Sequence, residues 1–134
     1  MAVPIDEGFR ILLAEDEAAV AMAYSKLLQA FGHLVATVYN GKDALSKLEE
    51  QEFDIVLMDI HMPVMNGIEA ICEIRNSVTK PYSHIPIIAV TAYCMTGDRE
   101  YFLEIGADAY VPKPCSIKEL DAEIRSLIPA NIFT

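Results

Sequence analysis

The sequence alternates short apolar runs with segments of helical character, and this alternation restricts its possible folds more than any other feature. The runs are RILLA, LVATV, DIVLM, PIIAV and AYV, which begin at residues 10, 34, 54, 86 and 109. Strands that alternate with helices along a chain form a parallel sheet with helical crossovers. A chain of 134 residues is the size of one ordinary domain. We therefore expect a single α/β domain over residues 1–134, with its core at about 10–127.

The composition of the runs predicts their order in the sheet. The first, third and fourth runs are the most continuously apolar, as is typical of strands covered on both faces, whereas the second and fifth are shorter or more mixed. With right-handed crossovers, the simplest arrangement that leaves the second and fifth strands at the edges has the order 2-1-3-4-5. We expect a flavodoxin-like, doubly wound, five-stranded parallel sheet with helices on both faces.

Helix signals lie between the runs. Asn40 is suited to cap the second helix, and Ser116 followed by Glu119 forms the pattern of a capping box for the last helix. The segment 76–84 has the composition of a surface loop. In the first helix, we expect one amphipathic stripe formed by Val20, Tyr24, Leu27 and Phe31.

Charge and composition exclude several classes of function. The formal net charge is −10, with 20 acidic and 10 basic residues, so we expect no direct binding of nucleic acid. No apolar run approaches 18 residues, and the first ten residues lack the pattern of a signal peptide, so we expect no membrane insertion and a cytoplasmic location. The three cysteines are widely spaced, which argues against a disulfide framework or a zinc site.

Polar residues follow four of the predicted strands. Glu15 and Asp16 follow the first strand, Asp59 the third, Thr91 the fourth and Lys113 the fifth. The carboxyl ends of parallel strands share one edge of the sheet, and ligands of open α/β sheets bind there. We therefore expect these five side chains to meet at one site.

The chemistry of such a site favours a phosphoryl group. Carboxylates placed close together raise one another's pKa unless a cation lies among them, and Mg²⁺ (or Mn²⁺) suits oxygen ligands. A metal, an ammonium group from Lys113 and a hydroxyl from Thr91 can neutralise the oxygens of a phosphoryl group. The carboxylate of Asp59 can then act as the nucleophile and form an acyl phosphate.

Each of these residues also has a simpler interpretation when it is taken alone. The acids at 15 and 16 are suited to the N-terminus of a helix, Asp59 to a turn, Thr91 to a turn, and Lys113 to a solvated surface. These interpretations weaken together, because each would have to place its residue at the same edge of the sheet by coincidence. The side chain of His61 has no second histidine or cysteine at ligand spacing, so we expect it to face solvent beside the site.

Four segments of the sequence are similar, in order and spacing, to the signature segments of the receiver domain of two-component response regulators. They are ILLAEDE, DIVLMDIHMPVMNG, PIIAVTAY and GADAYVPKP, and the resemblance extends from about Arg10 to Leu127. The stretches MDIHMPVMNG and TAYCMTGDREYFLEIGADAYVPKP are more similar to receivers of hybrid sensor histidine kinases than to those joined to DNA-binding domains. The sequence alone leaves open whether this receiver stands alone or belongs to a hybrid kinase.

The resemblance implies a role for each site residue. Asp59 corresponds to the phosphoacceptor and Lys113 to the phosphate-binding lysine, and the Lys113–Pro114 bond is expected to be cis. It also implies a metal site in which Asp16 and Asp59 bind Mg²⁺ directly and Glu15 binds it mostly through water. The backbone carbonyl of His61 is a further implied ligand.

A switch is also implied by the resemblance. Thr91 corresponds to the switch hydroxyl and Tyr110 to the switch aromatic, which together change the face formed by the fourth helix, fifth strand and fifth helix. His61 and Tyr93 stand in positions that flank the path of attacking water, so we expect them to slow dephosphorylation. Glu15 departs from the family pattern, in which aspartate is commoner.

The implied function is that of a phosphoprotein in a phosphorelay. The partner is a sensor histidine kinase or a histidine phosphotransfer domain, and self-association through the switch face is a further expected interaction. The receiver is not expected to be an enzyme, although it promotes its own phosphorylation and slow dephosphorylation.

Two alternatives are an aspartyl-phosphate phosphatase of haloacid-dehalogenase type, which requires an acid where His61 stands, and a phosphorylation-independent interaction module. A flavodoxin-type flavin binder lacks its phosphate loop here.

Overall fold

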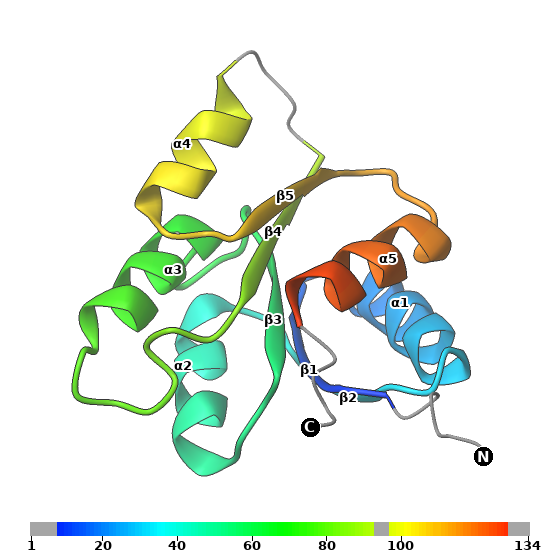
Figure 1. The fold of residues 1–134 in the computed structure, drawn as a ribbon, viewed down its shortest axis with the longest axis horizontal. Coiled ribbons are helices and arrows are strands. Elements are labelled where there is room, and N and C mark those ends of the chain that lie inside the picture. The colour runs from blue at the N-terminus through cyan, green and yellow to red at the C-terminus, as the bar shows by residue number, and fades with distance from the viewer. Residues whose placement is uncertain (1–7, 93–96, 129–134) are drawn as a thin grey trace.

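Strands and helices alternate along the whole chain in the computed structural model, which describes residues 8–92 and 97–128. Figure 1 shows the elements from β1 in blue to α5 in red. The elements in chain order are β1 (Arg10–Ala14), α1 (Ala18–Ala30), β2 (Leu34–Val38), α2 (Gly41–Glu50), β3 (Ile55–Asp59), α3 (Gly67–Asn76), β4 (Ile87–Thr91), α4 (Asp98–Ile105), β5 (Ala109–Pro112) and α5 (Ile117–Leu127).

The five strands form one parallel sheet in the order β2-β1-β3-β4-β5, which confirms the prediction. All residues of β3 and β4 are buried, whereas β2 and β5 form the edges. The register aligns the carboxyl ends of the three central strands, since Ala14 pairs with Met58 and Asp59 pairs with Val90. The end of β4 is aligned with β5 through Thr91 and Pro112. This register brings four strand ends to one edge of the sheet.

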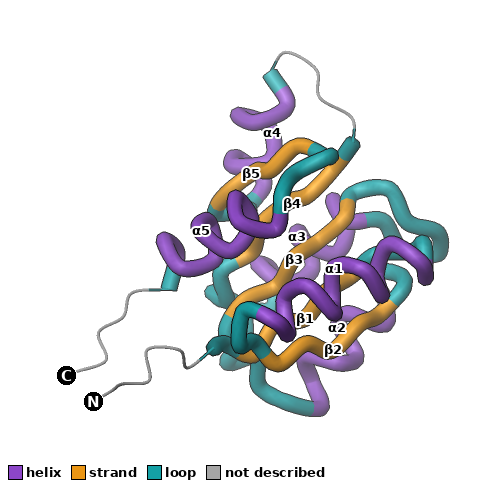
Figure 2. The backbone as a smooth tube through the Cα atoms, turned by 90° about the vertical axis from the view of Figure 1, so that its right-hand side faces the viewer, coloured by secondary structure: helices purple, strands orange, loops and turns teal. Residues whose placement is uncertain are grey.

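Helices cover both faces of the sheet, as predicted. In Figure 1, α2, α3 and α4 lie on one side and α1 with α5 on the other, and Figure 2 shows α1 and α5 toward the viewer with α3 behind the strands. Two apolar cores result, one on each face. Alternate residues of β1 supply them: Leu12 and Ala14 face the core under α2 and α3, while Ile11 and Leu13 face the core under α1 and α5.

The predicted helix caps are present. The Asn40 side chain accepts a hydrogen bond from the Asp43 backbone N–H at the start of α2. Ser116 and Glu119 form a capping box that begins α5. Residues 77–86, between α3 and β4, contain no helix or strand, in agreement with the predicted surface loop.

The predicted stripe of α1 is wrong in part. Leu27 is 46% exposed, and the residues that this helix buries are Ala21 and Leu28. Val20 and Tyr24 are half-buried. The apolar pattern did not identify the centre of the buried face of α1. Ala21 is small and adds little to a hydrophobic stripe, although its small side chain allows the helix to approach the sheet closely.

No helix in the described part of the chain is both long enough and apolar enough to span a membrane. Among the described residues, Cys72 and Cys115 are free thiols.

Candidate functional site

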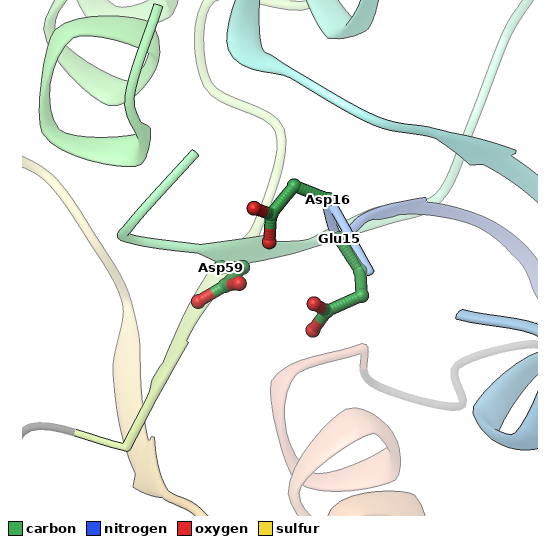
Figure 3. Close-up of side chains that lie close together, drawn as sticks. All are labelled: Glu15, Asp16 and Asp59. Carbon is green, nitrogen blue, oxygen red and sulfur yellow. The ribbon is translucent and has the colours of Figure 1, made fainter. Parts of the chain in front are cut away.

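Three carboxylates meet where β1 and β3 end. Glu15 and Asp16 follow the last residue of β1, and Asp59 is the last residue of β3. One carboxylate oxygen from each residue lies within 4.8 Å of the others, and Figure 3 shows the three side chains gathered at this edge of the sheet. Glu15 and Asp59 are only 2% and 7% exposed, whereas Asp16 is exposed. Two buried acids and one open acid thus form a single acidic group.

Lys113 supplies a positive charge to the same group from the end of β5. Its Nζ lies 2.6 Å from Glu15 Oε1, to which it donates, and 3.6 Å from Asp59 Oδ2. Its backbone N–H donates to the carbonyl of Thr91 at 2.8 Å, which fixes the position of Lys113 relative to the end of β4. The Lys113–Pro114 peptide bond is cis, as the resemblance implied.

The surroundings of Asp59 raise the pKa of its carboxyl group to about 6, from an ordinary value of 3.8. Burial is the largest cause, and the negative charge of Glu15 adds to it. The charge of Lys113 and a hydrogen bond from the His61 backbone act in the opposite direction, and Asp16 raises the pKa further. The acids therefore repel one another in the absence of a cation.

The pKa of Lys113 is raised above its ordinary value. Burial alone would lower it, but the hydrogen bond to Glu15 and the charges of Asp59 and Glu15 outweigh burial. Lys113 therefore carries a full positive charge at neutral pH, fixed beside the nucleophile candidate.

The loop after Asp59 is held tightly against the site. The Gly67 N–H donates to the Ile60 carbonyl at 2.8 Å, and Asn66 caps α3 in a capping box with Glu69. A Cβ atom at position 67 would lie 2.3 Å from the Asp59 carbonyl oxygen, so only glycine fits without movement of the backbone. The start of α3 thus packs directly on the residue that carries the candidate nucleophile.

The two predicted switch residues occupy neighbouring strands. Thr91 is fully buried at the end of β4, and Tyr110 is half-buried in β5, opposite Ala89. The Tyr110 ring stacks on the ring of Phe102 in α4, with 5.5 Å between ring centroids. The aromatic side chain therefore connects β5 to α4. Phe102 was not identified from the sequence as part of this arrangement.

Of the two residues expected to modulate dephosphorylation, the structure describes His61. The side chain of His61 is exposed, as predicted, and its backbone N–H bonds to Asp59. Tyr93 lies outside the described residues.

Sequence reasoning missed one neighbour of the site. Tyr24, predicted only as part of an apolar stripe, lies in α1 with its hydroxyl 3.8 Å from Cys115 Sγ. It lines a small cavity that Glu15, Asp59 and Lys113 also line. Burial, then interactions with Cys115 and the charge of Glu15, raise the pKa of Tyr24 to about 12. No local sequence signal could have placed it there, since its partners are distant along the chain.

The donor set is suited to a small hard cation. Carboxylate oxygens are the preferred ligands of Mg²⁺, which is commonly bound through one or two protein carboxylates. Within residues 8–92 and 97–128, Glu15, Asp16 and Asp59 are the acidic, histidine or cysteine side chains whose ligand atoms lie close enough together to hold one metal ion. The fold and this site define a class of protein: a doubly wound α/β domain with an acidic pair, an aspartate and a lysine at the switch point of its sheet.

The family model described as "Response regulator receiver domain" matches residues 11–125. The chain belongs to this family, and it is a receiver domain of the kind found in two-component systems.

Relatives with curated names include both kinases and transcriptional regulators. The chain is 41% identical over 124 residues to "Hybrid signal transduction histidine kinase I" of Dictyostelium discoideum, covering 89% of this chain and 7% of that protein. It is 39% identical over 119 residues to the "Transcriptional regulatory protein CpxR homolog" of Haemophilus influenzae, covering 89% of this chain and 50% of that protein. The chain therefore spans half or less of the length of these two relatives.

A solved structure similar to this chain contains a metal. It is the receiver domain of a sensor histidine kinase from Pseudomonas aeruginosa PAO1, with a magnesium ion coordinated in the active-site cleft. It is 35% identical to this chain, with a TM-score of 0.80, and the match covers 90% of this chain and 98% of that one.

Proposed function

We propose that this receiver domain accepts a phosphoryl group on Asp59 from a phosphohistidine and carries a signal in that form. The observation that carries the proposal is the position of Asp59, buried at the end of β3 with the Lys113 ammonium 3.6 Å from its carboxylate. Glu15 and Asp16 lie beside it within metal-binding distance. A carboxylate, a fixed cation and an acidic pair are the groups that an aspartyl-phosphate site requires.

The acids fit Mg²⁺, and we propose that Asp16 and Asp59 bind it directly, Glu15 mostly through water, and the His61 backbone carbonyl as a further ligand. Mg²⁺ in this position would offset negative charge on the phosphoryl oxygens and on the acids. Burial and, after it, the negative charge of Glu15 raise the pKa of Asp59, and a bound cation would relieve the repulsion between these acids, which supports this assignment.

The transfer step follows from the placement of Asp59 and Lys113. A carboxylate oxygen of Asp59 forms the bond to phosphorus as the phosphorus–nitrogen bond of the phosphohistidine breaks, and the imidazole leaves with the electron pair. Lys113 holds a phosphoryl oxygen by its charge, and Thr91 donates its hydroxyl to another. Attack of water on the acyl phosphate then releases inorganic phosphate and restores the Asp59 carboxylate.

The output of the domain is proposed to be a change of the face formed by α4, β5 and α5. Inward movement of the Thr91 hydroxyl toward the phosphoryl group would leave space for the Tyr110 ring, which now stacks on Phe102 of α4. This face would then change its partners, which include a second copy of the domain. The donor would be a sensor histidine kinase or a histidine phosphotransfer domain.

The domain is proposed to act as a receiver that promotes its own phosphorylation and slow dephosphorylation, and not as an enzyme with separate substrates. The exposed His61 and residue Tyr93 are proposed to slow the loss of phosphate by flanking the path of water. The acidic charge of the chain argues against direct binding of nucleic acid. The free thiols of Cys72 and Cys115 fit a reducing compartment such as the cytoplasm.

The decisive experiment is phosphorylation of the purified domain by acetyl phosphate with Mg²⁺, followed by intact-mass spectrometry. We expect the wild type to gain the mass of one phosphoryl group and Asp59→Asn to gain none. Asp54→Asn is the matched control, because Asp54 precedes the same strand at its opposite end, where its carboxylate binds the Arg10 backbone. Equal labelling of the wild type and Asp59→Asn would overturn the proposal.

The proposed role of His61 has its own measurement. We expect His61→Ala to lose its phosphoryl group faster than the wild type after removal of acetyl phosphate. An unchanged half-life would remove His61 from the dephosphorylation path.

A further inference from the structure

A cavity of about 460 Å³ opens at the edge of the sheet opposite to the three acids. One wall is formed by the end of α2 and the segment that leads into β3, and it includes Leu48 and Phe53. The other wall is the segment between α3 and β4, with Tyr82 and Ile85, which passes beside α2 in Figure 1. Cavities of this size hold small organic ligands. The cavity next to Lys113, at about 10 Å³, has room for about one water molecule.

The two walls of the large cavity are tied to each other. The Tyr82 hydroxyl donates to the carboxylate of Glu49 in α2 at 2.5 Å, and Lys80 Nζ lies 3.1 Å from the same carboxylate. On its other side, the segment is held to α3, because Arg75 donates to the Ser83 carbonyl at 2.9 Å. A ligand that enters the cavity would therefore not have to order this segment first, and a preformed site binds at a lower entropic cost.

The inner surface of the cavity is apolar and aromatic. Leu48 and Ile85 are 6% and 8% exposed and belong to the hydrophobic core under α2 and α3. Phe53 and Tyr82 are half-buried and pack against this core from the two walls. An apolar or aromatic group of a ligand would thus find aromatic side chains on both sides of it.

The rim of the cavity is acidic. Glu52 and Asp54 line it together with Arg10, and with His84 counted as neutral the two acids against one base leave an excess of one negative charge. Asp54 accepts the Arg10 backbone N–H at 2.7 Å, whereas Glu52 Oε1 lies 3.8 Å from Arg10 Nη1, which is beyond hydrogen-bond distance. The Glu52 side chain is 88% exposed, and the C-terminus of α2 adds its partial negative charge nearby. The rim therefore favours a positively charged ligand.

We propose that this cavity binds a small amphipathic amine, with its apolar or aromatic body between Phe53 and Tyr82 and its ammonium group at Glu52. The size of the cavity sets the size of the ligand, its inner surface selects the apolar body, and its rim selects the charge. The site is separate from the phosphoryl site, since β3 begins at Ile55 beside the cavity and ends at Asp59, about 13 Å away along the strand. The inference goes beyond the proposed function and does not depend on it.

Titration of the isotope-labelled full chain with phenethylamine, followed by the backbone amide signals in NMR, tests the site. We expect the signals of Phe53 and Tyr82 to shift and to saturate, with a Kd on the order of 1 mM. Phenethyl alcohol has the same ring and chain without the charge. It should bind at least about fivefold more weakly.

Charge reversal at the rim tests the position of the ammonium group. Glu52→Lys should weaken phenethylamine binding about fivefold or more, because it replaces an attraction by a repulsion. Glu50→Lys is the matched control, since it makes the same change at the last residue of α2, outside the lining of the cavity. It should change the Kd by less than about twofold. Asp16→Asn removes the exposed acid at the opposite edge of the sheet and should leave the Kd unchanged.

Four results would overturn the proposal. They are the absence of saturable shifts at Phe53 and Tyr82 up to about 10 mM phenethylamine, equal affinities for the amine and the alcohol, equal losses in Glu52→Lys and Glu50→Lys, and a loss of binding in Asp16→Asn. Shifts of the same amides with protein concentration alone would also overturn it and would assign the cavity to a second copy of the chain. None of these measurements uses a phosphodonor, so a failure of Asp59 to accept phosphate would leave this site to be judged separately.

Discussion

His33, just before β2, and Asp121, in α5, form a buried hydrogen bond, with 2.5 Å between His33 Nε2 and Asp121 Oδ1. The other ring nitrogen, Nδ1, accepts the backbone N–H of Phe9 at 3.0 Å. Because Nδ1 is an acceptor, Nε2 carries the proton and donates it to the carboxylate. Arg125 Nε binds the second oxygen of Asp121 at 2.9 Å and its guanidinium lies over the Phe9 ring.

Asp121→Ala is expected to destabilise the fold by about 1–3 kcal/mol, because it leaves a buried His33 N–H without its acceptor. The free energy of unfolding in urea at neutral pH measures the loss. Glu123→Ala on the same helix is the control, and it should change stability by less than about 0.5 kcal/mol. Equal effects of the two substitutions would show that the buried pair contributes nothing beyond the helix itself.

Much of the fold could be predicted from the sequence because its signals are local. Continuous apolar runs marked the central strands, and Asn40 and Ser116 marked two helix starts by side-chain chemistry that acts within three residues. The site could be outlined too, since topology alone requires the ends of parallel strands to meet. Those rules predict that Glu15, Asp59 and Lys113 lie together, as the structure shows.

The remaining features depend on pairs that are distant in sequence. The contact of Lys113 with Glu15 joins residues 98 positions apart, and that of His33 with Asp121 joins residues 88 apart. Which of two neighbouring carboxylates a lysine binds depends on differences in distance of about 1 Å, and the pattern of apolar and polar residues carries no information on such differences. The sequence could therefore place Lys113 at the site, but it could not show which acid binds it.

The raised pKa of Asp59 predicts that its charge weakens the metal-free fold at neutral pH. In the folded state Asp59 has a pKa of about 6, whereas the ordinary value, which we take for the unfolded state, is 3.8. The stability that protonated Asp59 contributes is therefore complete below pH 3.8 and is lost as the pH rises through 6. Asp59→Asn removes the charge. It should be more stable than the wild type at pH 7.5 in EDTA by on the order of 2 kcal/mol, with the difference shrinking toward pH 4.

Urea unfolding at both pH values measures this difference. Glu73→Gln, which changes an exposed acid of α3, serves as the control and should show no comparable gain. A wild type as stable as Asp59→Asn at pH 7.5 would contradict the predicted repulsion at the site.

The same pKa sets the pH dependence of metal binding. A protonated Asp59 is a poor ligand, so Mg²⁺ affinity should be about tenfold lower at pH 5 than at pH 7.5, since one pH unit below a pKa leaves about a tenth of the carboxylate ionised. Calorimetric titration at the two pH values checks this. In Asp59→Asn, binding should be weak at both, and an equally steep pH dependence in that variant would assign the titration to another group.

Gly67 connects the start of α3 to the nucleophile, and Gly67→Ala tests that connection. The added methyl group would lie 2.3 Å from the Asp59 carbonyl oxygen and 2.8 Å from Ile60 Cα, both of which are backbone atoms that cannot turn aside. The variant must move either α3 or the end of β3, at a cost of about 1–3 kcal/mol in stability. Since Asp59 lies at that end, its phosphorylation by acetyl phosphate should slow together with the loss of stability.

Asn76→Ala, an exposed change at the opposite end of α3, should keep both near wild-type values. A Gly67→Ala domain with normal stability and normal phosphorylation would show that the close packing of α3 on Asp59 is not needed to position the carboxylate.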